Sequence, residues 1–131
     1  MTSAQPKTIV IVEDEPDTAE MFGEMMRLSG YRVLKVYGGA PALSVIANEK
    51  PAAVVLDLMM PDLSGLEVLK FMRQDPSLEQ IPVVVVSAKS LASDIRAGME
   101  AGATVYLTKP VAFQDLKSAV DQAIRTSVYQ G

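Results

Sequence analysis

The sequence contains neither cysteine nor histidine among its 131 residues. Without cysteine, the protein has no disulfide bond, no thiolate metal ligand and no thiol nucleophile. Without histidine, it lacks the general base of Ser-His and Cys-His hydrolases and the usual nitrogen ligand of zinc sites. These absences exclude most hydrolase and zinc chemistry, and the lack of cysteine is what we expect of a cytoplasmic protein.

The sequence also has no long apolar run and no basic stripe. A membrane-spanning helix needs about 20 consecutive apolar residues, and no signal-peptide pattern opens the chain, so we expect no membrane association. The net charge is −4; residues 1–65 contain five basic and nine acidic side chains, whereas residues 66–131 contain seven of each. Because nucleic acids are bound through clustered Lys and Arg, we expect no direct nucleic-acid binding.

Five short runs rich in β-branched residues predict β-strands. The runs are Thr8–Val12, Arg32–Val36, Ala53–Asp57, Val83–Ser87 and Thr104–Leu107. Three stretches within them, Ile9–Val12, Ala53–Leu56 and Val83–Val86, are continuously apolar. Continuous apolar stretches of this length are typical of strands that are covered on both faces.

The segments between the strands place apolar residues at helical spacing. The predicted helices are Asp17–Ser29, Ala40–Asn48, Leu66–Arg73, Leu91–Ala101 and Phe113–Ser127. The last two carry regular apolar stripes, formed by Leu91, Ile95 and Met99 and by Leu116, Val120 and Ile124. We expect most of the methionines to fill the core. Asp62 or Ser64 is expected to cap the third helix.

Strands and helices alternate five times along the chain, which predicts an α/β fold. The expected architecture is a doubly wound, five-stranded parallel sheet with strand order 2-1-3-4-5 and right-handed crossovers. A chain of 131 residues fits one domain, which we expect to span residues 1–131 with its core over residues 8–127. In this topology the ligand crevice lies at the carboxyl ends of strands 1 and 3.

Acidic residues follow the first and third predicted strands. Glu13 and Asp14 end the first strand, Glu15 comes next, and Asp57 ends the third. Bringing these carboxylates together costs repulsion and desolvation, which a hard cation such as Mg²⁺ offsets, using one or two carboxylates as ligands. The Glu-Asp-Glu run equally suits a helix N-terminus, where the helix dipole favours acids. Both interpretations of the run remain open at this point.

Ser87 ends the fourth predicted strand and Lys109 follows the fifth, so both are expected at the same edge of the sheet. Each is weak evidence alone, because a hydroxyl after a strand often caps the next helix and most lysines are solvated. A phosphoryl group on a carboxylate needs a nucleophile, a metal, a fixed cation and a hydrogen-bond donor. Asp57, Mg²⁺, Lys109 and Ser87 would supply these in that order.

Four stretches of the sequence together form a recognisable pattern. They are Ile9–Pro16, Val55–Gly65, Val83–Ala88 and Ala101–Pro110. In this order and at these spacings they resemble the receiver domains of two-component response regulators, the CheY-like family. The resemblance covers nearly the whole chain, from Thr8 to about Ser127. It implies a signalling domain that catalyses only its own phosphorylation and dephosphorylation.

The resemblance also implies roles for particular residues. Asp57 would accept a phosphoryl group from a phosphohistidine on a sensor histidine kinase or a His-containing phosphotransfer protein. Asp14, Asp57 and the backbone carbonyl of Met59 would hold Mg²⁺. Glu13 would act nearby through water, and Lys109 would contact the phosphoryl group.

A conformational switch is the next implication of the resemblance. Ser87 and Tyr106 would form it, and the peptide before Pro110 would be cis. If Ser87 turns toward a new phosphoryl oxygen, Tyr106 fills the vacated space, and a downstream protein or output domain reads the change over Leu91–Ser127. A homodimer remains open, although Thr104-Val105 replaces acidic residues that family members with winged-helix outputs commonly use in dimer contacts.

Two other functions remain open from the sequence. A phosphatase of the haloacid-dehalogenase type also has an aspartate nucleophile at a strand end, but it needs a second aspartate where this sequence has Met59. A phosphorylation-independent protein-binding module would be expected to lose Asp57 or Lys109, and both are present. No glycine-rich phosphate loop follows the first strand, which argues against a nucleotide-binding module.

Overall fold

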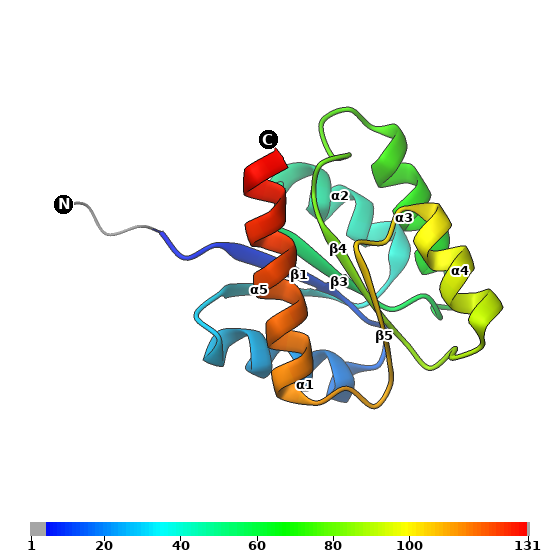
Figure 1. Ribbon diagram of the computed structural model, residues 1–131, viewed down its shortest axis with the longest axis horizontal. Coiled ribbons are helices and arrows are strands. Elements are labelled where there is room, and N and C mark those ends of the chain that lie inside the picture. The colour runs from blue at the N-terminus through cyan, green and yellow to red at the C-terminus, as the bar shows by residue number, and fades with distance from the viewer. Residues whose placement is uncertain (1–4, 131) are drawn as a thin grey trace.

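Five strands alternate with five helices along the chain (Figure 1), and the computed structural model describes residues 5–130. The strands are β1 (Thr8–Val12), β2 (Arg32–Val36), β3 (Ala53–Leu56), β4 (Val83–Ser87) and β5 (Val105–Thr108). The helices are α1 (Pro16–Leu28), α2 (Gly39–Glu49), α3 (Gly65–Gln74), α4 (Ala92–Ala101) and α5 (Phe113–Gln130). All ten predicted elements are present, and residues 1–4 and 131 of the expected single domain lie outside the described residues. Within residues 5–130, no helix is long and apolar enough to cross a membrane.

The five strands form one parallel sheet in the order β2-β1-β3-β4-β5, as predicted. β1 pairs with both β2 and β3, and Val10 lies between Leu34 on one side and Val54 on the other. Because all strands run in the same direction, their carboxyl ends meet at one edge of the sheet. The loops that follow β1 and β3 are therefore neighbours, although more than forty residues separate them in the sequence.

Alternate side chains of each strand fill two separate core layers. Ile9 and Ile11 pack with residues of α1 and α5, whereas Val10 and Val12 pack with residues of α2 and α3. Figure 1 shows α1 and α5 on one face of the sheet and α2, α3 and α4 on the other. Coverage of both faces explains why the central strands are continuously apolar.

The apolar stripe predicted on α5 faces the core, but the one predicted on α4 does not. The buried α5 stripe consists of Leu116, Val120 and Ile124. On α4, Leu91 at the N-cap and Met99 are 68% and 45% exposed, and the only buried residue of the helix is Gly98. The predicted helix is present, but it turns its glycine toward the sheet, where the ring of Tyr106 occupies the adjoining space.

The methionines are divided between the core and the surface. Met26 and Met72 are fully buried, but Met21, Met59 and Met99 are about half exposed. The expectation that methionines mostly fill the core was therefore wrong for the last three. Met21 and Met99 lie on the outer sides of α1 and α4 and Met59 lies in the loop after β3, and the unbranched methionine side chain tolerates either environment.

The two expected cap residues serve different helices. The Ser64 hydroxyl accepts a backbone N–H of α3 and caps that helix, as predicted. The Asp62 carboxylate instead accepts the N–H groups of Gly39 and Ala40, at 3.1 and 3.0 Å, at the start of α2. Asp62 can serve α2 because the N-cap position of that helix is Gly38, which has no side chain to accept a hydrogen bond. The N–H groups of Ala40 and Gly39 hold the pKa of Asp62 below its usual range.

Candidate functional site

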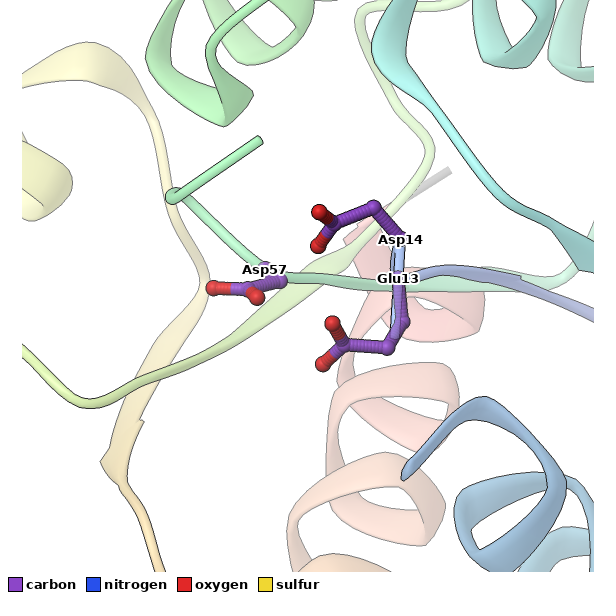
Figure 2. A group of neighbouring side chains, drawn as sticks. All are labelled: Glu13, Asp14 and Asp57. Carbon is purple, nitrogen blue, oxygen red and sulfur yellow. The ribbon is translucent and has the colours of Figure 1, made fainter. Parts of the chain in front are cut away.

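Three acidic side chains meet where β1 and β3 end. The strand pairing continues past both ends, because Glu13 N–H donates to the carbonyl of Val36 and Asp57 N–H donates to the carbonyl of Val12, each at 3.0 Å. Figure 2 shows the carboxylates of Glu13, Asp14 and Asp57 directed toward a shared space. One oxygen from each carboxylate lies within 4.8 Å of the other two. The structure thus brings together the acidic residues that the sequence placed at this edge.

Lys109 reaches the same space from the loop between β5 and α5. Its Nζ lies 2.7 Å from Glu13 Oε1 and 3.3 Å from Asp57 Oδ2. The backbone N–H of Lys109 donates to the carbonyl of Ser87 at 2.9 Å, and the Lys109-Pro110 peptide is cis, as the resemblance implied. Lys109 is therefore held at the edge of the sheet and paired with two carboxylates instead of being freely solvated.

Burial and the contact with Lys109 shift the pKa values of groups in the acidic cluster. Glu13 is 1% and Asp57 5% exposed. Burial raises the pKa of Glu13, and the hydrogen bond from Lys109 counteracts part of that rise. Burial by itself lowers the pKa of Lys109, but its contacts with Glu13 and Asp57 outweigh this effect and the pKa is raised. Lys109 therefore remains a cation at neutral pH and offsets part of the negative charge.

The donor set of the cluster suits a hard divalent cation. All three acidic groups offer oxygen, and Mg²⁺ uses one or two carboxylates while keeping several water ligands. Both oxygens of Glu13 are already engaged, one with Lys109 and the other with the N–H of Glu15 at 3.2 Å. Asp14 is partly exposed. Both oxygens of Asp57 also accept hydrogen bonds, from the N–H of Met59 and from Lys109, whereas Asp14 has no such contact within residues 5–130. The cluster of Glu13, Asp14 and Asp57 fits Mg²⁺ by its donor atoms.

The loop after β3 is folded tightly around Asp57. The backbone N–H of Met59 donates to Asp57 Oδ1 at 3.1 Å. The N–H of Gly65 donates to the carbonyl of Leu58, and a Cβ at Gly65 would lie only 2.3 Å from the carbonyl oxygen of Asp57. A side chain at position 65 would therefore force the loop open. Glycine at this position lets the start of α3 lie directly against the backbone of Asp57 and Leu58.

The acidic run after β1 divides between the two interpretations that the sequence left open. Glu15 Oε1 accepts the N–H groups of Asp17 and Thr18 at 2.8 and 3.3 Å and caps α1. Glu13 and Asp14 instead face Asp57. The helix-cap interpretation is confirmed for Glu15, whereas Glu13 and Asp14 form the acidic cluster that the metal interpretation requires.

The two predicted switch residues meet at the backbone of Lys89. Ser87 is fully buried, and its Oγ accepts the N–H of Lys89 at 3.1 Å. The hydroxyl of Tyr106 donates to the carbonyl of the same residue at 2.8 Å. Sequence reasoning missed Lys89 because its part in this arrangement is played by backbone atoms, which leave no signal in the residue type.

Comparison with known proteins identifies relatives of the whole fold. A family model described as the response regulator receiver domain matches residues 9–121. Response regulator MprA of Mycobacterium sp. (strain KMS) is 38% identical over 120 residues, which are 92% of this chain and 51% of MprA. Polar-differentiation response regulator DivK of Brucella anthropi is 32% identical over 106 residues, which are 81% of this chain and 86% of DivK. This chain therefore spans about half the length of MprA and most of the length of DivK.

A solved structure shares the fold and adds a metal ion. The receiver domain of sensor histidine kinase PA1611 from Pseudomonas aeruginosa PAO1 aligns with a TM-score of 0.86 and 26% identity, covering 92% of this chain and 99% of that domain. That structure has a magnesium ion coordinated in its active-site cleft. The strand order, the match over residues 9–121 and the identity to response regulators agree. The chain belongs to the family of response regulator receiver domains.

Proposed function

We propose that the domain accepts a phosphoryl group on Asp57 in a Mg²⁺-dependent reaction. The observation that carries this proposal is the position of the Asp57 carboxylate. It lies between Lys109 Nζ at 3.3 Å and the N–H of Met59 at 3.1 Å, beside the carboxylate of Asp14. A nucleophile, a fixed cation and a pair of metal-binding carboxylates thus share one buried edge of the sheet.

The proposed donor is a phosphohistidine on a sensor histidine kinase or a His-containing phosphotransfer protein. An oxygen of Asp57 attacks the phosphorus, the phosphorus–nitrogen bond breaks, and the imidazole keeps the electron pair of that bond. Lys109 contacts the transferred group and stabilises the charge on its oxygens. The Met59 N–H orients the carboxylate for attack. The domain would act on no substrate other than its own phosphoryl group.

Asp14, Asp57 and the backbone carbonyl of Met59 are the proposed ligands of Mg²⁺. When bound, the metal supplies positive charge to the transferred oxygens. Glu13 is proposed to act through water, as the resemblance to receiver domains implies, while its two oxygens keep their contacts with Lys109 and the N–H of Glu15. The magnesium ion in the related Pseudomonas receiver domain supports this assignment.

The switch is proposed to run through Ser87 and Tyr106 to the face formed by α4, β5 and α5, residues Leu91–Ser127. If the Ser87 hydroxyl rotates toward a new phosphoryl group, the charge-assisted hydrogen bond that forms stabilises the rotated state by about 1.5–3 kcal/mol. That differential shifts a two-state equilibrium by roughly ten- to a hundredfold. Rotation of Ser87 would break the hydrogen bond that its Oγ accepts from the N–H of Lys89. The carbonyl of the same residue accepts the hydrogen bond from the Tyr106 hydroxyl, so Tyr106 would be affected as well. A groove of ≈ 580 Å³ on this face, lined partly by Ile95 and Tyr106, offers a surface for a partner.

The remaining assignments are part of the same proposal. We propose one receiver domain over residues 1–131, located in the cytoplasm, that signals to a downstream protein or output domain without binding nucleic acid or membrane itself. A homodimer is compatible with the exposed side of α4. The family assignment leaves the haloacid-dehalogenase and phosphorylation-independent alternatives without support.

The test of the acceptor uses acetyl phosphate and Mg²⁺. One phosphoryl group, labile to hydroxylamine, should be added to the wild type and should be absent from Asp57→Asn, as measured by intact-protein mass. The matched control is Asp17→Asn, an exposed aspartate in the first turn of α1, which should be modified like the wild type. Equal modification of Asp57→Asn would show that the acceptor is another residue.

The metal ligands are tested separately by titration with Mg²⁺. Asp14→Asn should weaken binding at least tenfold, because a charged ligand becomes a neutral one, while the fold stays intact. Glu15→Gln changes the neighbouring acid, which caps α1 instead, and should leave the affinity within about twofold of the wild type. An unchanged affinity in Asp14→Asn would remove this residue from the site.

A further inference from the structure

The ring of Tyr106 lies directly against the backbone of α4 at Gly98. A Cβ built on Gly98 would lie 2.8 Å from Cδ2 and 2.9 Å from Cε2 of that ring. Carbon atoms in contact stay about 3.5–4.0 Å apart. The ring therefore occupies space that any other residue at position 98 would need. Gly98 is also the only residue of α4 that is buried.

The ring is held at its other end as well. The Tyr106 hydroxyl donates to the carbonyl of Lys89 at 2.8 Å, and the ring packs against the core layer that α2 and α3 share with the sheet. The N–H of Lys89 donates to Ser87 Oγ. The ring and Ser87 thus contact the same residue through neighbouring peptide groups, so a displacement of the ring would act on the backbone beside Ser87.

The C-terminal end of α4 is tied to α3, so the helix cannot easily withdraw from the ring. Arg73 Nε donates to the carbonyl of Gly102, the C-cap of α4, at 2.9 Å. A second nitrogen of Arg73 donates to the carbonyl of Ile81 at 2.8 Å. Gly102 has a φ of 115°, and a Cβ there would lie 2.6 Å from Arg73 Cγ. Gly98 lies one helical turn before this tie. If a side chain at position 98 clashed with the ring, the ring and not the helix would therefore have to move.

We infer that Gly98 is a positioning residue of the switch. Because Gly98 has no side chain, it leaves a space on α4, here called the seat, in which the Tyr106 ring lies while its hydroxyl donates to the carbonyl of Lys89. The consequence for signalling rests on the proposed function, whereas the seat itself does not. A methyl group at position 98 closes the seat. Tyr106 then leaves this packing whether or not Asp57 carries a phosphoryl group, and its position no longer reports phosphorylation.

The seat is tested first in the protein without any added anion. The chain has four tyrosines, so incorporation of 3-fluorotyrosine gives a simple ¹⁹F spectrum in which Tyr106→Phe identifies the resonance of residue 106. Gly98→Ala should move this resonance and leave that of Tyr31 unchanged. The control is Gly23→Ala, the same change inside α1, where the new Cβ would lie 3.3 Å from Lys35 Cδ and 3.5 Å from Val33 Cγ1, far less crowded than at Gly98. A Tyr106 resonance at the wild-type position in Gly98→Ala would overturn the inference.

A double-mutant cycle tests the same contact through stability. Replacing a helical glycine by alanine favours the helix, so Gly98→Ala should raise Tm by a few degrees once the ring is removed by Tyr106→Ala. With Tyr106 present, the same change should raise Tm less or lower it. Equal changes in Tm in the two backgrounds would mean that the ring does not meet the methyl group.

The signalling consequence is tested with beryllofluoride and Mg²⁺. In Gly98→Ala, amide shifts of the loops after β1 and β3 should still report binding at Asp57, but the response of the Tyr106 resonance should be largely lost. A wild-type response of Tyr106 in this variant would contradict the inference. Failure of the wild type itself to bind beryllofluoride would count against the proposed function, and the anion-free spectra would still decide whether Gly98 is the seat.

Discussion

Helices α4 and α5 carry the same apolar pattern and use it in opposite ways. Three apolar side chains follow one another every four residues in each region. Those of α5 are buried, whereas Leu91 and Met99 beside and on α4 are 68% and 45% exposed. A glycine and the ring of Tyr106 take the inner side of α4. Apolar periodicity therefore identifies a helix, but it does not tell which face of the helix the rest of the fold will cover.

The same difference has a functional meaning. α5 is anchored by its core stripe and by Tyr31, whose hydroxyl donates to the carboxylate of Asp121. α4 has a single buried residue and is tied down mainly at its C-terminal end by Arg73. A helix with few buried contacts has a low cost of local movement. The proposed switch face therefore combines one helix that is anchored along its length with one that is held mainly at its C-terminal end.

The largest effect is expected when matched leucines are truncated on the two helices. Leu116→Ala should lower the free energy of unfolding by about 2–5 kcal/mol, because it leaves a cavity in the core. Leu91→Ala should change it by no more than about 0.5 kcal/mol, because the side chain is largely exposed. Urea unfolding followed by circular dichroism measures both values. Similar losses in the two variants would show that the α4 stripe is buried after all.

An intermediate effect is expected from the tie between α3 and α4. Arg73→Met removes hydrogen bonds to the carbonyls of Gly102, Glu79 and Ile81. The expected loss is about 1.5–3 kcal/mol, the range for hydrogen bonds from a charged group. Amide hydrogen exchange should increase most at the end of α4 and little in α5.

The matched control for this tie is Arg96→Met, an exposed arginine on α4 itself. Its stability should stay within about 0.5 kcal/mol of the wild type. If Arg73→Met left hydrogen exchange in α4 unchanged, the helix would be held by other contacts, and α4 would not differ from α5 in depending on a tie at one end.

The smallest effect concerns the anchor of α5. Tyr31→Phe should cost about 0.5–1.5 kcal/mol at neutral pH, because Asp121 loses a hydrogen-bond donor. Burial, and then the contact with Asp121, raise the pKa of Tyr31. A raised pKa in the folded state means that the contribution is complete below the unfolded pKa of about 10 and is lost as the pH rises above it.

The alkaline part of the stability profile checks this prediction. Wild-type stability should fall above pH about 10, and the fall should be smaller in Tyr31→Phe. Tyr37→Phe, which alters an exposed tyrosine, serves as the control and should retain the wild-type profile. Parallel profiles in wild type and Tyr31→Phe would exclude Tyr31 as the titrating anchor.

Much of the site could be predicted because it depends on strand ends. Asp14 and Asp57 follow apolar strands, and the parallel topology alone brings such positions to one edge. Lys109 and Ser87 were located by the same reasoning, while their functional roles stay predictions. By contrast, the backbone contacts of Lys89 could not be foreseen, because these hydrogen bonds depend on where Ser87 and Tyr106 come to lie in space.

Local sequence by itself determined the ten elements, their order along the chain and the strand order of the sheet, because apolar periodicity and chain length leave few parallel arrangements. Only the tertiary structure decided that Asp62 caps α2, that Arg73 holds the end of α4, and that Gly98 receives the ring of Tyr106. Each of these contacts joins segments at least eight residues apart in the sequence. Such contacts depend on the relative placement of whole elements, which no local pattern of residues records.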